Sequence, residues 1–173
     1  ALNALVAFAI GLELKIDNLK LSKSLSTFLG VKRRFTYVLK YPKIIIDDYA
    51  HHPKEIDEIR RSIKELYPEK KVTAVFQPHL YSRTRDFMRE FAKSLSLFDE
   101  IVLTDIYPAR EKPIKNINSE NLLNIIDNKN KCLTNKTNLP KYLSKSSSDI
   151  FVIMGAGDIS EEVQMIKKHI ELL

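Results

Sequence analysis

The sequence has few of the residues that mark secreted or zinc-binding proteins. Cys132 is the only cysteine among 173 residues, which excludes an internal disulfide and fits a reducing, cytoplasmic setting. We interpret it as an unreactive thiol rather than a catalytic one. One cysteine and the adjacent pair His51 and His52 lack the spacing of a tetrahedral zinc site, so no metal ligands are expected in this chain.

Long apolar runs are also absent. No window approaches the roughly 18 uninterrupted apolar residues of a membrane span, and no charged, apolar and small-residue succession marks a signal peptide. We therefore expect a soluble protein without membrane contact. The 44% hydrophobic content is typical of globular proteins, and the length suits one domain with a fragment of a second.

Two motifs of phosphate binding and hydrolysis are missing. No G-x-x-x-x-G-K-[ST] segment is present, so residues 1–173 contain no phosphate-binding P-loop. No G-x-S-x-G segment is present either, which argues against a serine hydrolase. The segment GAGD, residues 155–158, is a lone G-x-G without a third glycine and is a weak dinucleotide signal.

The charge of +6, from 28 Lys and Arg against 22 Asp and Glu, fits either nucleic acid or a small anion as partner. The lysines are spread along the chain without the interleaved aromatics of an RNA-binding platform, so nucleic acid is not expected. The arginines are more concentrated. Arg33, Arg34, Arg83 and Arg85 fall at predicted loops and helix starts.

Residues 1–34 are predicted to form two helices with Asp17 as a cap and Gly30 as the stop. Their apolar faces are Leu5, Phe8 and Leu12, then Leu21, Leu25 and Phe28. Two short helices make a poor domain alone, and the chain starts within a helical pattern without Met. We therefore expect a piece of a longer protein.

From residue 35 onward, predicted strands and helices alternate. The expected strands cover residues 35–39, 44–47, 72–76, 101–105 and 150–154, and helices follow Pro53, surround Phe91, begin at a Ser119 cap and end the chain. Residues 129–149 are expected to be a polar connection. This alternation predicts an α/β fold, Rossmann-like, with a mostly parallel sheet, helices on both faces and one amino-terminal antiparallel hairpin strand.

The helical spacing also predicts which apolar side chains face the core. They are Ile56, Ile59, Ile63 and Leu66; Phe87, Phe91, Leu95 and Phe98; Leu122, Leu123 and Ile126; and Val163, Ile166, Ile170 and Leu173.

The segment DDYAHHPKEI, residues 47–56, lies at a predicted strand-to-helix junction. Ligands of open α/β sheets bind at such junctions, and we interpret Asp48, Tyr49 and His51 as site residues. For the neighbouring residues we favour structural roles over binding roles: His52 is predicted to cap the helix, and Asp47 to brace the turn.

The segment QPHLYSRTR, residues 77–85, forms a second junction of the same kind. His79 and Arg83 lie on its loop and first helical turn, where a guanidinium can hold a carboxylate with two parallel hydrogen bonds. An anion is therefore the expected ligand, with a solvated basic turn as the alternative. Ser82 is predicted to cap the helix, and Arg85 to lie on the surface.

Two further turns follow predicted strands. In DIYPAREKP, residues 105–113, Tyr107, Arg110 or Glu111 could edge the site, and a plain surface loop is equally open. In GAGD, the glycines permit close backbone approach to a ligand. Its possible site-edge residues are Gly155, Gly157 and Asp158.

The segments DDYAHHP, FQPHLYSRTR, DIYPAREKPI and MGAGDI, in this order and at these intervals, resemble the carboxyl-terminal domain of the Mur ligase family, in its alanine-adding branch. ALNAL and FLGVKRRF resemble the end of that family's central ATP-binding domain. The resemblance implies a division into residues 1–34 and a ligase domain, residues 35–173. Leu80 stands where the family often has Arg.

The resemblance implies an ATP-dependent, ADP-forming ligase that joins L-alanine to UDP-N-acetylmuramate through an acyl phosphate, in the peptidoglycan synthesis that cell shape and division require. This part would bind the amino acid and close over ATP. Asn3, Arg34, Asp48 and Tyr49 would contact ATP, and His51, His79 and Arg83 would orient alanine.

The P-loop, the Mg²⁺ ligands and the nucleotide-sugar domain would lie upstream. No catalytic residue is assigned within residues 1–173, and this part alone should be inactive. The alternative is a stand-alone α/β module that binds a nucleotide or RNA without catalysis, an interpretation that depends only on charge and fold.

Overall fold

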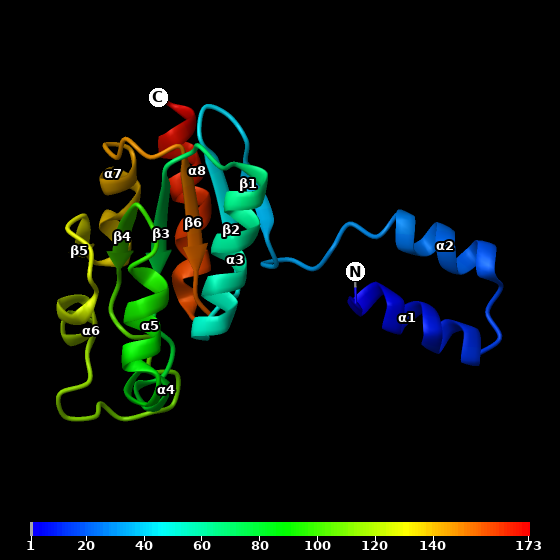
Figure 1. The fold of residues 1–173 in the computed structure, drawn as a ribbon. Coiled ribbons are helices and arrows are strands. Elements are labelled where there is room, and N and C mark those ends of the chain that lie inside the picture. Colours follow the sequence, from blue (N-terminus) through cyan, green and yellow to red (C-terminus); the bar gives the residue numbers. More distant parts are fainter. Residues whose placement is uncertain (1) are drawn as a thin grey trace. The chain divides into compact units, whose positions relative to one another are not determined.

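A computed structural model describes residues 2–173. The chain divides into two compact units, residues 1–32 and residues 33–173. The second unit contains the sheet and most of the helices (Figure 1).

The first unit consists of α1 (Leu2–Glu13) and α2 (Asn18–Ser26). Asp17 caps α2 as predicted, since its Oδ1 accepts hydrogen bonds from the amides of Leu19 and Lys20, both at 3.1 Å. Gly30 does not end this helix, because α2 already stops at Ser26 and Thr27 is the C-cap. Of the predicted inward residues, three are half-buried and three exposed: Phe8, Leu21 and Leu25, then Leu5, Leu12 and Phe28.

Within the described residues, one six-stranded sheet has the order β1-β2-β6-β3-β4-β5. The strands are β1 (Thr36–Leu39), β2 (Ile44–Asp48), β3 (Val72–Phe76), β4 (Glu100–Leu103), β5 (Lys131–Leu133) and β6 (Ile150–Met154). Only β1 and β2 pair antiparallel, and the other neighbours are parallel. The predicted fold class and hairpin are therefore confirmed.

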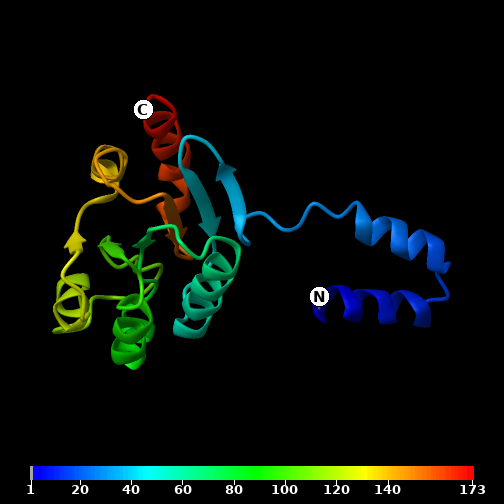
Figure 2. The ribbon, with the colours of Figure 1, turned by 45° about the horizontal axis from the view of Figure 1, so that its top comes forward.

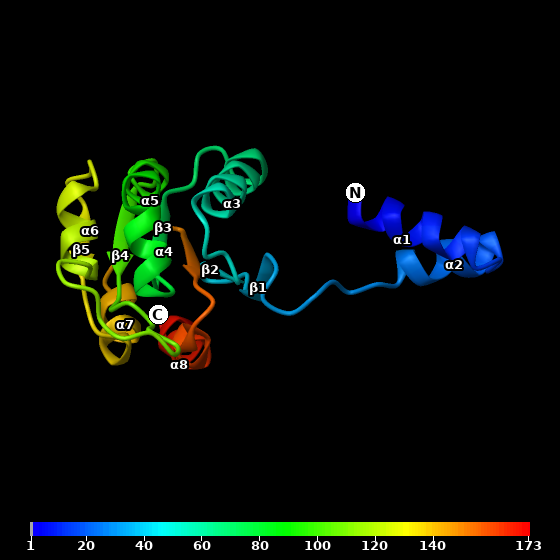
Figure 3. The same ribbon diagram turned by 90° about the horizontal axis from the view of Figure 1, so that it is seen from below.

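Helices cover both faces of this sheet (Figure 3). They are α3 (Pro53–Leu66), α4 (Tyr81–Asp86), α5 (Met88–Leu95), α6 (Ser119–Ile125), α7 (Leu139–Leu143) and α8 (Val163–Glu171), with 3₁₀ turns η1 (Lys136–Asn138) and η2 (Asp158–Glu162). α3, α5 and α6 pack on one face, and α7 and α8 pack on the other. The hairpin lies beside α8 (Figure 2).

The central strands read as continuous apolar runs because both of their faces are covered. Along β2, Ile44 and Ile46 join the core under α3 and α5, whereas Ile45 joins the core under α8. All five residues of β3 and of β6 are buried. None of the helices between residues 2 and 173 is both long and apolar enough to cross a membrane.

The structure corrects two predicted stretches. The helix expected around Phe91 is two helices, α4 and α5, with Phe87 at their junction and Phe98 buried beyond the end. Residues 129–149 are not merely a polar connection, because they contain β5, η1 and α7. Elements of three to five residues are too short to give a clear hydrophobic period.

Three further details differ from the sequence predictions. The cap of α6 is Asn118, whose side chain accepts from the amide of Asn121 at 2.7 Å. Ser119 instead donates from Oγ to the carbonyl oxygen of Thr104 at 2.7 Å. Leu66 and Leu173 are 57% and 63% exposed rather than inward, because they lie at chain positions where their helices end.

Candidate functional site

The parallel strands β2, β6, β3 and β4 end at one edge of the sheet. Met154 is paired in register with both Asp48 and Phe76, and Phe76 is paired with Leu103. The two predicted junctions therefore lie at the same edge, on either side of the turn that follows β6. This is the edge at which ligands of open α/β sheets bind.

Four ring side chains form a continuous row along this edge, which we call the aromatic row: Tyr49, His51, His79 and Tyr107. The ring centroids of successive members are 5.3, 6.1 and 5.6 Å apart. The last pair, His79 and Tyr107, is stacked at an interplanar angle of 18°. The row thus brings residues from the loops after β2, β3 and β4 into contact.

Arg83 joins the row through His79. Its Nη1 lies 3.2 Å from Nδ1 of His79. A guanidinium only donates hydrogen bonds, so Nδ1 must accept, and the ring is neutral with its proton on Nε2. Burial lowers the pKa of His79 below its ordinary value of 6.5, and the charges of Arg83 and His51 lower it further. A neutral histidine beside a cation is suited to a carboxylate ligand.

His51 and His52 have different roles. Nδ1 of His51 donates to the carbonyl oxygen of Tyr49 at 2.9 Å, which orients the ring toward the row. His52 caps α3 as predicted: its ring accepts from the amide of Lys54, and Glu55 accepts from the amide of His52 at 3.1 Å. This reciprocal arrangement is a capping box.

Both carboxylate oxygens of Asp48 accept hydrogen bonds from the backbone. Its Oδ2 accepts from the amide of Phe35 at 2.6 Å, and its Oδ1 from the amide of Ala50 at 2.8 Å. Burial raises the pKa of the Asp48 carboxyl, against the lowering effect of these hydrogen bonds. Asp48 therefore fixes the geometry of the turn that presents Tyr49.

Three of the four residues predicted to contact ATP share one pocket. Arg34, Asp48 and Tyr49 line a hollow of about 330 Å³ beside the start of α3. Arg34 is exposed, and its charge acts to lower the pKa of Asp48 in this hollow. The fourth, Asn3, is an exposed residue of α1 in the first unit.

Arg33, for which the sequence predicted only a loop position, contacts three groups at this edge of the sheet. Its Nε lies 3.5 Å from Oδ1 of Asp47, its Nη2 donates to the carbonyl oxygen of Gly155, and its guanidinium lies 5.0 Å from the centroid of the Tyr49 ring. Asp47 accordingly braces the turn as predicted. The sequence shows two adjacent arginines here, Arg33 and Arg34, but it does not indicate which of them points inward.

The turn of residues 155–158 is packed against protein. A Cβ on Gly155, whose φ is +152°, would lie 3.0 Å from the carbonyl oxygen of Gln77, and one on Gly157 would lie 2.6 Å from Cγ of Tyr107. Asp158 accepts from Nε2 of Gln77 at 2.8 Å and pairs with Lys136. The glycines therefore allow close approach to Gln77 and Tyr107.

Sequence reasoning missed Gln77 and Lys136. Gln77 is 2% exposed and also accepts from the amide of Ile159 at 3.1 Å. Its place in the QPH segment was a signal, but burial could not be read from it. Lys136 fell in the stretch expected to be a polar connection.

The loop of residues 105–113 continues the edge beyond β4. Tyr107 belongs to the aromatic row, and Arg110 is exposed on the same loop. Glu111 accepts hydrogen bonds from Ser82. The prediction that Ser82 caps α4 is wrong. The N-cap position belongs to Leu80, which makes no side-chain capping bond. Arg85 is exposed and paired with Asp86, as expected for a surface residue.

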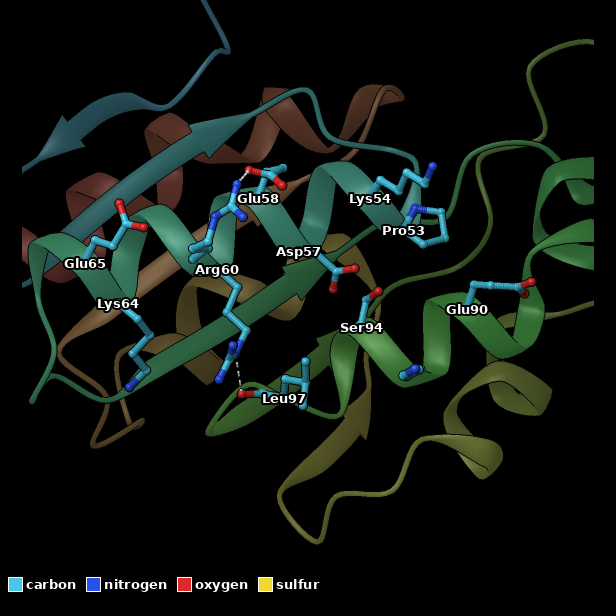
Figure 4. Close-up of a pocket in the computed structure, with 12 residues that line it drawn as sticks. Pro53, Lys54, Asp57, Glu58, Arg60, Lys64, Glu65, Glu90, Ser94 and Leu97 are labelled. Carbon is cyan, nitrogen blue, oxygen red and sulfur yellow. Dashed lines mark hydrogen bonds and ion pairs between the residues drawn. The ribbon is translucent and has the colours of Figure 1, made fainter.

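A separate groove runs along α3 and α5 (Figure 4). It measures about 690 Å³ and is lined mainly by charged side chains of both signs. Nε of Arg60 donates across it to the carbonyl oxygen of Leu97 at 2.8 Å. The groove follows helix surfaces rather than strand ends, and the predicted site residues lie elsewhere.

A mostly parallel sheet with helices on both faces, and with an arginine and two histidines at the carboxyl ends of its strands, defines an α/β domain suited to a small anionic ligand. Residues 33–157 match the model of the family described as "Mur ligase, glutamate ligase domain". This match covers most of the chain, which therefore belongs to the Mur ligase family.

The curated relatives include UDP-N-acetylmuramate–L-alanine ligases from several bacteria. The chain is 53% identical to that of Flavobacterium psychrophilum over 170 residues, which are 98% of this chain and 38% of the relative. It is 44% identical to that of Porphyromonas gingivalis over 173 residues, again 38% of the relative. The chain thus spans less than two fifths of the length of these relatives.

Solved structures show the same architecture. The UDP-N-acetylmuramate-alanine ligase of Thermotoga maritima superposes with a TM-score of 0.76 at 28% identity, covering 99% of this chain and 37% of that one. A murein peptide ligase of Psychrobacter arcticus superposes with a TM-score of 0.70 at 22% identity, covering 99% and 36%. At 22% identity, the similarity to the second structure shows a shared fold and nothing further.

Proposed function

We propose that this chain is part of an ATP-dependent, ADP-forming ligase that joins L-alanine to UDP-N-acetylmuramate in cytoplasmic peptidoglycan synthesis. Residues 35–173 would be its amino-acid-binding domain, and residues 1–34 the end of its ATP-binding domain. The observation that carries this proposal is the contact of Arg83 with a neutral His79 beside His51. The names of the curated relatives support the choice of substrates.

In this proposal, Arg83 holds the carboxylate of L-alanine through paired hydrogen bonds, and His79 and His51 orient the rest of the small molecule. The neutral state of His79 keeps Arg83 in contact with it, because a protonated His79 would repel the Arg83 guanidinium. In the same proposal, the edge of the site would consist of Tyr107, Arg110, Gly155, Gly157 and Asp158.

The reaction proceeds in two transfers. ATP supplies the γ-phosphoryl group that the muramoyl carboxylate accepts, which gives an acyl phosphate and ADP. The amine of L-alanine then attacks the acyl carbon, and phosphate leaves with loss of one proton from the amine. Because such transfers depend on positioning and charge neutralisation, this domain contributes by orienting the amine.

The nucleotide would meet this chain at the pocket of Arg34 and Tyr49. An exposed guanidinium suits phosphate oxygens. Asp48, whose oxygens each accept one backbone amide, keeps acceptor capacity and would meet the ribose side of ATP together with Tyr49. The P-loop and the Mg²⁺ ligands would belong to the upstream part. A stand-alone nucleotide- or RNA-binding module finds no support in the family match.

Replacement of Arg83 tests this proposal in the complete enzyme. We expect Arg83→Ala to raise KM for L-alanine, or lower kcat, far more than it changes KM for ATP, because breaking a buried guanidinium–carboxylate pair costs roughly 2 to 5 kcal/mol. Arg83→Lys should restore only part of the activity, since an ammonium lacks the planar fork. Steady-state kinetics with each substrate varied gives the answer.

The matched control is Arg85→Ala. Arg85 lies two residues further along α4, is exposed and pairs with Asp86, so its removal should leave alanine kinetics unchanged. Unchanged alanine kinetics in Arg83→Ala, or equal damage in Arg85→Ala, would contradict the proposal.

A further inference from the structure

The helix that carries Arg83 has no cap of its own. α4 has six residues, and its N-cap residue Leu80 makes no side-chain capping bond and has a φ of +72°. A helix this short is not stable by itself. The position of Arg83 relative to His79 therefore depends on what else holds the first turn of α4.

Glu111 holds that turn from another part of the chain. Its Oε2 accepts from the amide of Ser82 at 2.9 Å, and its Oε1 accepts from the Ser82 hydroxyl. These bonds lower the pKa of Glu111 below its ordinary value. A carboxylate 29 residues downstream thus satisfies an amide that a helix start leaves unpaired.

The loop that carries Glu111 is itself fastened to the residues before α4. The amide of Tyr107 donates to the carbonyl oxygen of Pro78 at 2.8 Å, and the amide of Leu80 donates to that of Tyr107 at 2.9 Å. The Tyr107 ring stacks on His79. One loop therefore supports His79 at one end and the start of α4 at the other.

We propose that Glu111 is a positioning residue for the amino-acid substrate: it fixes the first turn of α4 so that the Arg83 guanidinium stays against His79. The inference depends on the proposed function, because it assigns Glu111 a part in the same site. Glu111 acts through Ser82 and α4 and need not touch the substrate.

Substitution of Glu111 in the complete enzyme tests this inference. We expect Glu111→Ala to raise KM for L-alanine about tenfold, which corresponds to the free energy that loss of a strong helix cap costs. KM for ATP should change less than about twofold. Glu111→Gln should have a smaller effect, because its amide oxygen still accepts one hydrogen bond. The control is Glu65→Ala, an exposed glutamate in α3, which should leave both values unchanged.

A double substitution separates positioning from general damage. If Glu111 acts through Arg83, Glu111→Ala should change alanine kinetics less than about twofold in an Arg83→Ala background. The same factor in both backgrounds, or an equal rise in KM for ATP, would overturn the inference. The inference would also be overturned if Glu111→Ala lost activity only because the variant unfolds at the assay temperature, as its melting temperature would show.

The single substitutions also distinguish this inference from the proposed function. Unchanged alanine kinetics in Arg83→Ala would defeat the proposed function. A large effect of Arg83→Ala with no effect of Glu111→Ala would defeat only the role of Glu111.

Discussion

At the scale of single residues, the surroundings of His79 determine its protonation state. Its ring is surrounded by the Arg83 guanidinium, the His51 ring and the stacked Tyr107. Burial lowers the pKa of His79, the charges of Arg83 and His51 lower it further, and the charge of Glu111 raises it. The folded protein thus resists protonation of this histidine more strongly than the unfolded chain does.

This difference predicts a pH-dependent contribution to stability. The unfolded chain takes up a proton near pH 6.5, the ordinary pKa of histidine, and the folded protein does so only at lower pH. Stability is therefore full above pH 6.5 and falls as the pH drops toward the folded pKa. We expect denaturant unfolding at pH 7.5 and 5.5 to show a larger loss for the unmodified chain than for His79→Gln. Equal losses would contradict this.

At the scale of elements, helix starts were the least predictable local feature. The cap of α3 could be identified in the sequence, since His52, Pro53 and Glu55 are neighbours. The caps expected at Ser82 and Ser119 were wrong, because a hydroxyl near a helix start has competing partners. Ser82 bonds Glu111, and Ser119 bonds the carbonyl oxygen of Thr104.

The cap of α6 provides a test at this scale. We expect Asn118→Ala to lower the free energy of unfolding by about 1 kcal/mol, because it removes the acceptor for the Asn121 amide. Asn124→Ala, at an exposed position of the same helix, should be neutral or slightly stabilising, since Ala favours helix interiors. Denaturant titrations compare the two, and a larger loss in Asn124→Ala would refute the assignment.

At the scale of the whole molecule, the two units differ in what they bury. In the second unit, the central strands β3 and β6 are buried along their full length. In the first unit, Leu5, Leu19 and Phe28 are 64%, 80% and 65% exposed. Burial of apolar surface is the main stabilising contribution to a fold, so the two units should differ in stability.

Hydrogen exchange can measure this difference in the isolated chain. We expect the amides of β3 and β6 to be the best protected, and those of α1 and α2 to exchange much faster, because few buried contacts hold the two helices. Protection of residues 2–30 equal to or above that of β6 would show that the first unit is stable alone.

Catalysis should require more than this chain. Residues 1–173 contain no P-loop, so we expect the pure chain to show no magnesium-dependent ATP turnover and no amide formation. A protein that includes the upstream domains is the positive control. Phosphate release by the pure chain above the level of buffer would contradict the division of labour proposed here.

The sequence by itself determined the alternation of strands and helices, the two covered faces of the sheet and the residues at the first two junctions. Apolar periodicity is local, and so are turn and helix signals. The tertiary structure alone decided that β6 separates β2 from β3, that Arg33 rather than Arg34 points inward, and that Glu111 holds α4. Each depends on contacts between residues distant in sequence, whose partners no local pattern specifies.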